Sequence, residues 1–316
     1  MTTGPPTISV VVPVYRSERS LDELVERIVA TLGPYTAAYE IVLVNDGSPD
    51  GSWAKICAIA AADPHVRGLS LSRNYGQHNA LLAGIRAARH EIIVTVDDDL
   101  QHQPEQIPVL VELITDDVDL VYGYPEKENH SMARNFLSRA TKLTLGASIG
   151  SDVAEHISAF RAFRTVLREG FTEVQDPFLS IDVLLSWTTN HAVTVAVPMD
   201  DRRYGESNYS SAKLVRYALN LITGFSTLPL RVVSYLGFGF AVFGMGILAY
   251  VLITYVAHGG QSSPGFPFLA SLISILSGAQ LFAIGIIGEY IGRLHYRSMN
   301  RPPYVLRSAT TDLPPA

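Results

Sequence analysis

The chain has 316 residues, of which 17% are charged and 47% are hydrophobic, and its formal net charge is −6 at pH 7. The low charged fraction and a mean hydropathy above zero indicate that apolar sequence is concentrated in some part of the chain. The negative charge argues against nucleic-acid binding, and the single cysteine, Cys57, excludes an intrachain disulfide and a multi-cysteine metal site.

Short runs rich in Val, Ile and Leu alternate with amphipathic segments over the first two-thirds of the chain. The first run is too short for a signal-peptide core and is broken by Pro13, so we expect no such peptide. Predicted strands cover residues 8–12, 40–44, 66–71, 91–96 and 119–122, and predicted helices cover residues 21–32, 53–62, 79–89 and 106–114. This alternation predicts an α/β domain whose mostly parallel sheet has helices on both faces.

The composition changes after Leu230. Residues 232–291 contain no Lys, Arg or Asp, and Glu289 is their only acid. Two apolar stretches, 232–257 and 266–291, each exceed the length that a hydrocarbon core of about 30 Å requires at about 1.5 Å per residue. We predict two transmembrane helices; the alternative is a pair of buried helices in a soluble protein.

Basic residues flank the two apolar stretches, whereas the loop between them has no Lys or Arg. The positive-inside rule therefore predicts that both ends of this segment lie in the cytoplasm. Apolar residues at helical spacing in residues 211–225 indicate either an amphipathic helix at the membrane surface or a helix packed on the α/β domain. We expect a cytosolic domain (residues 1–210), a juxtamembrane segment (211–230), a transmembrane domain (231–297) and a cytosolic tail (298–316).

The acidic turn, residues 97–101 with the sequence Asp-Asp-Asp-Leu-Gln, is the strongest local signal. It follows a predicted strand, and open α/β sheets bind ligands at the carboxyl ends of their strands. Clustered carboxylates repel one another, and a hard divalent cation that bridges to phosphate oxygens relieves this repulsion. Asp97 and Asp99 point the same way if the segment is extended, and address different ligands if it turns; Asp98 is interpreted as a bystander. A solvated acidic loop is the alternative.

Two other strand ends carry weaker signals. The first predicted strand is followed by Tyr15 and has Pro13 near its end, where a dinucleotide-binding fold would have a glycine-rich turn, so a nicotinamide or flavin enzyme is disfavoured. The second strand ends in Asn45-Asp46-Gly47-Ser48, whose carboxylate suits a nucleobase or ribose, although these residues are also ordinary in turns.

Five motifs, taken in this order, resemble the family 2 glycosyltransferases and, more narrowly, their polyprenyl-phosphate branch. The motifs are Pro13-Val14-Tyr15, Asn45-Asp46-Gly47-Ser48, Ser72-Arg73-Asn74-Tyr75-Gly76-Gln77, the acidic turn, and Arg202-Arg203-Tyr204-Gly205-Glu206-Ser207. Residues 227–231 and 288–293 are similar to the members that have two membrane helices. The resemblance extends from about residue 8 to residue 301, which is nearly the whole chain.

The resemblance implies a GT-A (Rossmann-like) fold and an inverting transfer that uses Mg²⁺ or Mn²⁺. The donor would be a nucleotide-sugar, with a UDP-sugar suggested by the two-helix relatives, and the acceptor would be polyprenyl (undecaprenyl or decaprenyl) phosphate. The product would be a lipid-linked monosaccharide for cell-envelope glycans. The same resemblance implies a multi-pass protein of the bacterial inner membrane, with its catalytic domain on the cytoplasmic side, and suggests a homo-oligomer.

The resemblance also assigns roles to residues that match the family motifs. Pro13, Tyr15, Asp46 and Asp97 would contact the nucleotide-sugar, with Gly205 and Ser207 shaping the same site. Asp99 and Gln101 would hold the metal, Arg202 would lie at the diphosphate, and Arg134 and Ser138 would meet the lipid phosphate. Glu155, where relatives have Asp, would act as a base, orient the acceptor, or be structural.

Two positions depart from the family pattern. Asn208 stands where relatives commonly have Lys, which removes one positive charge expected near the phosphates, and Arg203 and Lys213 are candidate replacements. Asn45 stands where relatives have a second aspartate.

Two other functions fit parts of the sequence. A processive polysaccharide synthase should carry a Gln-x-x-Arg-Trp element and more membrane helices. In this chain Trp187 follows Ser186 instead of an arginine, and only two membrane helices are predicted. A non-catalytic membrane scaffold would not need the intact acidic turn.

The acceptor implied by the resemblance is a phosphate monoester. Its second pKa is about 6, so its oxygen is largely ionised at neutral pH and needs little help from a base.

Overall fold

The computed structural model describes residues 6–36, 38–126, 151–175, 179–200, 228–257, 265–299 and 301–312. The chain divides into two units. The sheet unit comprises Met1–Ala218 and Asn300–Ala316, and the helical unit comprises Leu219–Met299.

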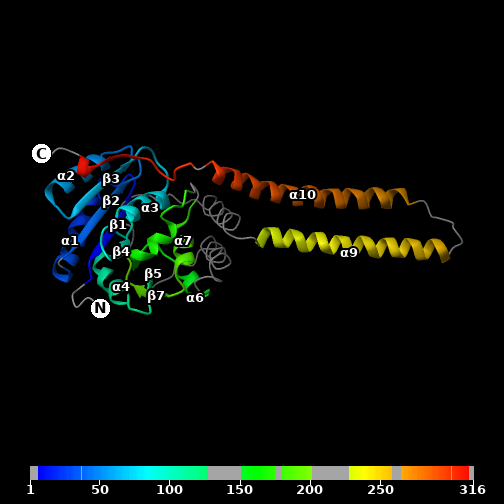
Figure 1. Ribbon diagram of the computed structural model, residues 1–316, viewed down its shortest axis with the longest axis horizontal. Coiled ribbons are helices and arrows are strands. Elements are labelled where there is room, and N and C mark those ends of the chain that lie inside the picture. Colours follow the sequence, from blue (N-terminus) through cyan, green and yellow to red (C-terminus); the bar gives the residue numbers. More distant parts are fainter. Residues whose placement is uncertain are drawn as a thin grey trace. The chain divides into compact units, whose positions relative to one another are not determined.

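Strands of the described residues form one sheet in the order β7-β5-β6-β4-β1-β2-β3-β8 (Figure 1). The pairs β1–β2, β2–β3, β1–β4 and β5–β7 are parallel, whereas β6 pairs antiparallel with β4 and β5, and β8 pairs antiparallel with β3. The strands are β1 (Ile8–Val14), β2 (Tyr39–Asn45), β3 (Val66–Leu71), β4 (Ile92–Thr95), β5 (Leu120–Pro125), β6 (Arg161–Arg164), β7 (Ala192–Val197) and β8 (Leu306–Ala309).

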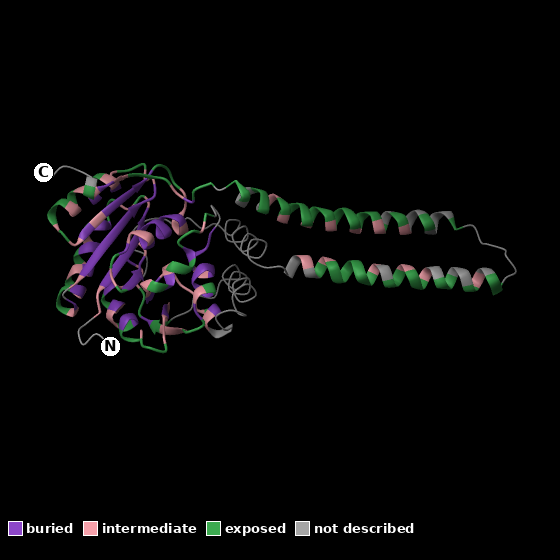
Figure 2. Cartoon of the chain, viewed as in Figure 1, coloured by how far each residue is buried: buried purple, intermediate pink, exposed green. Residues whose placement is uncertain are grey.

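Helices cover both faces of this sheet. They are α1 (Leu21–Tyr35), α2 (Ser52–Ala62), α3 (Gln77–Ala87), α4 (Ile107–Glu112), α6 (Ser151–Glu155) and α7 (Ile181–Thr188), with 3₁₀ turns η1 (Pro104–Gln106), η2 (Thr165–Phe171) and η3 (Thr310–Asp312). One buried cluster joins apolar side chains of α1, α2 and α4 to the sheet, and a second joins those of α3, η2 and α7. Every residue of β1 and β2 is buried (Figure 2), because strands covered on both faces have no solvent side.

The five predicted strands and four predicted helices of the first 122 residues are confirmed, with ends that shift by a few residues. Three strands were not predicted. β6 is antiparallel and has only four residues, and β7 lies beyond the last predicted strand.

The third unpredicted strand, β8, lies in residues 298–316, which the sequence assigns to a tail. Its Ala309 and Ser308 pair with Leu69 and Ser70 of β3. The Thr310 hydroxyl accepts a hydrogen bond from the Gly68 N–H at 2.9 Å. The chain after the helical unit thus adds the last strand to the sheet unit.

The helical unit contains α9 (Leu228–Ala257) and α10 (Phe266–Ser298). Large apolar side chains are exposed along both helices, among them Tyr235, Phe238, Leu281 and Leu294 (Figure 2). Within the described residues, α10 contains a stretch that is long and apolar enough to cross a membrane, Ile275–Gly292, and α9 contains a shorter apolar stretch, Val232–Ile247. The predicted pair of transmembrane helices therefore stays a prediction.

Two helical glycines allow the packing of α3 on the sheet to be tested. A Cβ added at Gly84 would lie 2.3 Å from Val11 Cγ1, whereas one at Gly33, an exposed residue near the end of α1, would have no atom within 4 Å. We expect Gly84→Ala to lower the free energy of unfolding by about 1–3 kcal/mol through overpacking. Gly33→Ala meets no such neighbour and should change it by less than about 1 kcal/mol, because the gain of alanine in a helix is opposed by Pro34, which disfavours helical backbone at a preceding residue that has a Cβ.

Urea unfolding of the detergent-solubilised chain, followed by the fluorescence of Trp53 and Trp187, measures both changes. A stabilising Gly84→Ala would contradict the close approach of α3 to β1.

Candidate active site

The register of the parallel strands brings the ends of β1 to β4 to one edge of the sheet. Val14 pairs with Asn45, Asn45 with Ser70, and Val11 with Thr95. The loops that follow these strands, including the acidic turn, therefore lie at the edge where open α/β sheets bind ligands.

Asp98 joins the acidic turn to the loop after β1. Its Oδ2 accepts hydrogen bonds from the Tyr15 N–H, at 3.1 Å, and from the Ser17 hydroxyl. Its carbonyl accepts the Ser20 hydroxyl at 2.7 Å. Burial raises the pKa of the Asp98 carboxyl to about 6, although the hydrogen bonds from the Ser17 hydroxyl and the Tyr15 N–H lower it. The predicted bystander thus has a structural role.

Pro13 and Tyr15, two predicted nucleotide contacts, lie at the end of β1. Pro13 is buried within the strand, and Tyr15 is half-buried just beyond it, with the Arg16 guanidinium 5.3 Å from the centre of its ring. Arg16 has a φ of 60°, a left-handed conformation that is uncommon outside glycine. The hydrogen bond to Asp98 holds this sharp turn in place.

Asp46, a third predicted nucleotide contact, is buried and holds the loop after β3. Its two carboxylate oxygens accept the backbone N–H groups of Tyr75, at 2.7 Å, and Gly76, at 2.8 Å. Burial raises the pKa of Asp46, and these two hydrogen bonds partly offset the rise. Gly47 has a φ of 61°, and a Cβ there would lie 2.4 Å from the Arg73 carbonyl carbon, so both its conformation and the close approach require glycine.

Asp97 is half-buried between two polar side chains that sequence reasoning missed. The Gln77 amide, at the start of α3, donates to Asp97 Oδ1 at 2.7 Å. Asp97 also interacts electrostatically with the buried guanidinium of Arg161 in β6. Gln77 ends the Ser72–Gln77 motif, which was the available signal for it. Arg161 begins β6, a four-residue strand that was not predicted, and no motif marked it.

Arg161 is 1% exposed and belongs to a buried polar network. Its Nε donates to the Thr95 hydroxyl at 3.0 Å, and its Nη1 donates to Asp182 of α7. The Tyr122 hydroxyl donates to the same Asp182 oxygen at 3.3 Å. Burial lowers the pKa of Arg161, but Asp182, Tyr122 and Asp97 outweigh it, so the pKa is raised and the guanidinium stays charged.

Asp99 and Gln101, the predicted metal ligands, lie on either side of Leu100. The Gln101 N–H donates to Asp99 Oδ1 at 3.1 Å, which closes a tight turn. Leu100 has a φ of 60° and is fully buried. Strained residues of this kind persist only where the surrounding contacts fix them, and they often occur at functional sites.

Glu155 is exposed at the end of α6. The next residue, His156, contacts Tyr124 of β5, with ring centres 4.1 Å apart. These contacts do not test a catalytic role for Glu155, which stays a prediction.

The remaining predicted site residues lie outside the described part of the chain. They are Arg134, Ser138, Arg202, Gly205 and Ser207, together with Asn208 and its candidate replacements Arg203 and Lys213. Their assigned roles stay predictions.

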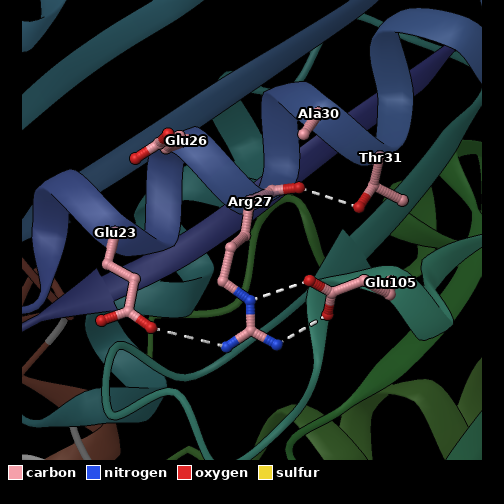
Figure 3. A pocket seen from close by; sticks show the side chains of 6 residues that line it. All are labelled: Glu23, Glu26, Arg27, Ala30, Thr31 and Glu105. Atoms are coloured by element: carbon pink, nitrogen blue, oxygen red, sulfur yellow. Dashed lines mark hydrogen bonds and ion pairs between the residues drawn. The ribbon is translucent and has the colours of Figure 1, made fainter.

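A surface pocket of about 580 Å³ lies between α1 and η1. It is lined by Glu23, Glu26, Arg27, Ala30, Thr31 and Glu105, none of which the sequence places in the site (Figure 3). Arg27, one of these lining residues, donates two hydrogen bonds to Glu105, of 2.8 and 2.7 Å. The pocket is therefore a surface hollow around an exposed ion pair and not part of the predicted site.

The chain is similar to known proteins over nearly its whole length. Residues 9–171 match the model of glycosyl transferase family 2, and residues 228–294 match that of the GtrB C-terminal hairpin. An undecaprenyl-phosphate 4-deoxy-4-formamido-L-arabinose transferase of Shewanella sediminis (strain HAW-EB3) is 35% identical over 95% of this chain and 91% of its own length. The enzyme of the same name from Pseudomonas paraeruginosa is 35% identical over 98% and 93%.

Solved structures show the same fold at low sequence identity. Glucosyl-3-phosphoglycerate synthase from Mycobacterium tuberculosis, in complex with Mn²⁺, UDP and its product, has a TM-score of 0.52 and 20% identity. The match covers 69% of this chain and 78% of that one. The predicted α/β fold of the GT-A type, with a mostly parallel sheet, is confirmed.

The buried network beneath the acidic turn generates a stability prediction. Asp182→Asn removes the negative partner of the buried Arg161 guanidinium and should lower the free energy of unfolding by about 3–5 kcal/mol. The control Glu105→Gln weakens an exposed ion pair and should cost about 1 kcal/mol or less. Urea unfolding of both variants measures the difference, and equal losses would contradict it.

Proposed function

Because this chain belongs to glycosyl transferase family 2, we propose that it transfers a sugar from a nucleotide-sugar to polyprenyl phosphate, with inversion at the anomeric carbon. The main support is the match to the Shewanella sediminis relative, which is named for its undecaprenyl-phosphate acceptor. That match covers 95% of this chain and so extends over both the sheet unit and the helical unit. The product in this proposal is a lipid-linked monosaccharide for cell-envelope glycans.

The donor in this proposal is a UDP-sugar. The similar synthase from Mycobacterium tuberculosis was solved with UDP and Mn²⁺ bound, which supports this nucleotide for the same fold. The names of the relatives make 4-deoxy-4-formamido-L-arabinose the first sugar to test, with glucose and other amino sugars as alternatives.

The acidic turn fits a divalent metal. Mg²⁺ is commonly held by one or two carboxylates and completed by substrate phosphates and water. Asp98 is engaged by the loop after β1, while Asp99 and Gln101 supply oxygen donors on the next residues of the turn. Among the described residues no group of three or more His, Cys, Asp or Glu could hold a metal, so in this proposal the diphosphate would supply further ligands. We assign the ion to Asp99 and Gln101; once bound, it would offset charge on the departing nucleoside diphosphate.

The side chains of the site then have to position two anions. The acceptor phosphate is ionised at neutral pH, so catalysis depends on placement and on positive charge. In this proposal Arg202 binds the donor diphosphate, with Gly205 and Ser207 beside it, and Arg134 and Ser138 bind the lipid phosphate. Glu155 orients the acceptor, and it has little role as a base because the acceptor phosphate is already ionised.

On the donor side, Tyr15 and Asp97 contact the nucleoside in this proposal, beside Pro13 and Asp46. The Gln77 amide occupies one oxygen of Asp97, which fixes the direction of the other. The two hydrogen bonds of Asp46 fix the loop that carries Gln77. Two of the proposed nucleoside contacts are thus coupled through residues 75–77.

We also propose that α9 and α10 both cross the bacterial inner membrane, with the sheet unit on the cytoplasmic side. The exposed apolar side chains of both helices and the apolar stretch Ile275–Gly292 support this. The basic residues at Arg231 and after Ile291 support the orientation. A homo-oligomer, suggested by the family, stays a proposal.

A donor panel tests the proposal. Membranes containing the chain should move label from one UDP-sugar into the organic phase when undecaprenyl phosphate is present, and EDTA should abolish this. The product should release a single sugar on mild acid hydrolysis. A polymeric product would contradict the proposal, as would lipid labelling that persists in EDTA.

Substitutions in the site should rank in a defined order. Asp99→Ala should lower turnover by at least about a hundredfold, because it removes a proposed metal ligand. Glu155→Gln should lower it by about tenfold or less, because the acceptor arrives ionised. Asp116→Ala, an exposed acidic control, should not change it. Equal losses for Asp99→Ala and Glu155→Gln would favour a general-base role for Glu155.

A further inference from the structure

The acidic turn leads into a segment that is attached to the chain following β7. The Asp200 N–H donates to the Gln101 carbonyl at 2.9 Å, and His102 and Met199 form an antiparallel bridge. The Gln103 side-chain amide donates from Nε2 to Asp200 Oδ1 at 2.7 Å. The first two contacts are between backbone groups, so only the third depends on which side chains are present.

We propose that Gln103 and Asp200 are positioning residues, a latch that holds the acidic turn at a fixed spacing from the chain leading to Arg202. The latch rests on the proposed function, because the diphosphate of the nucleotide is the ligand that both segments would bind. Arg202 follows Asp200 by two residues, so movement of Asp200 away from Gln103 separates the two predicted halves of the diphosphate site.

One side of the latch belongs to a fixed element. The Gln103 carbonyl accepts the Gln106 N–H at 3.0 Å, which starts η1. Glu105 of this turn is bound to Arg27 of α1 (Figure 3). Arg27 also interacts electrostatically with Asp200. Gln103 is therefore held by its own turn and by α1, whereas Asp200 lies three residues after Val197, the last residue of β7.

The strained backbone of the acidic turn explains why such a latch is needed. Leu100 is left-handed with a φ of 60°, and a residue of this kind is kept in place by its surroundings. His102 provides one such contact, since it is buried and stacks on Phe160 with ring centres 5.3 Å apart. The contacts to Met199 and Asp200 provide the others, next to the proposed metal ligand Gln101.

Isosteric substitutions separate the latch from general stability. Gln103→Glu keeps the shape but places two carboxylates face to face, whereas Asp200→Asn keeps an acceptor for the Gln103 amide. The double variant Gln103→Glu with Asp200→Asn restores an amide–carboxylate pair with its polarity reversed. The matched control is Glu112→Gln, which makes a carboxylate-to-amide change at an exposed residue at the end of α4, outside the latch and its anchors.

Isothermal titration of UDP with Mn²⁺ into the detergent-solubilised full chain measures the effect. We expect Gln103→Glu to raise the Kd by about tenfold, the loss expected for one hydrogen bond to a charged group. Asp200→Asn and the double variant should stay within about threefold of wild type, and Glu112→Gln should not change the Kd. Thermal unfolding of each variant should show a similar Tm.

Three results would overturn the latch: a wild-type Kd for Gln103→Glu, a double variant as impaired as Gln103→Glu, or an equal loss for Glu112→Gln. Wild-type chain that fails to bind UDP with Mn²⁺ would overturn both the latch and the proposed UDP donor. A chain that binds UDP normally but labels no lipid would contradict the proposed acceptor and leave the latch supported by its own Kd series.

Discussion

Mutual repulsion among carboxylates at one sheet edge is the constraint on which the site depends. The strand register gathers Asp46, Asp97, Asp98 and Asp99 there. The fold compensates them with donors from different loops: two backbone N–H groups for Asp46, a backbone N–H and a hydroxyl for Asp98, and an amide with the buried Arg161 charge for Asp97. The interactions that offset the charge are therefore the same ones that position the loops.

The parts of the fold that could be predicted from the sequence are those determined by burial. β1 and β2 are covered on both faces, so their sequences are continuous apolar runs, and helix α1 shows its buried face at helical spacing. The acidic turn was recognisable because parallel strands place their carboxyl ends at one edge. The buried strands, the buried face of α1 and the acidic turn could each be predicted because each pattern lies within a few neighbouring residues of the sequence.

The parts that could not be predicted depend on partners distant in sequence. β6 has only four residues, and its buried Arg161 is paired with Asp182, which lies 21 residues further along the chain. Strand alternation predicted that Asp98 would point away as a bystander. The strand ends at Thr95 and the turn contains the left-handed Leu100, so alternation does not extend to Asp98, which instead binds the loop 83 residues earlier.

β8 changes how the helical unit relates to the sheet unit along the chain. The helical hairpin, formed by α9 and α10, is inserted between β7 and β8 and is not appended after the sheet unit, because residues on both sides of it belong to that unit. Until β8 pairs, β3 is an edge strand with unpaired backbone groups. The Ser72 N–H, just after β3, donates to the Val305 carbonyl at 2.9 Å, and the same loop supplies the two N–H groups that bind Asp46. Synthesis from the N-terminus makes the hairpin before β8, so the loop that binds Asp46 gains its last support only after the hairpin has been made.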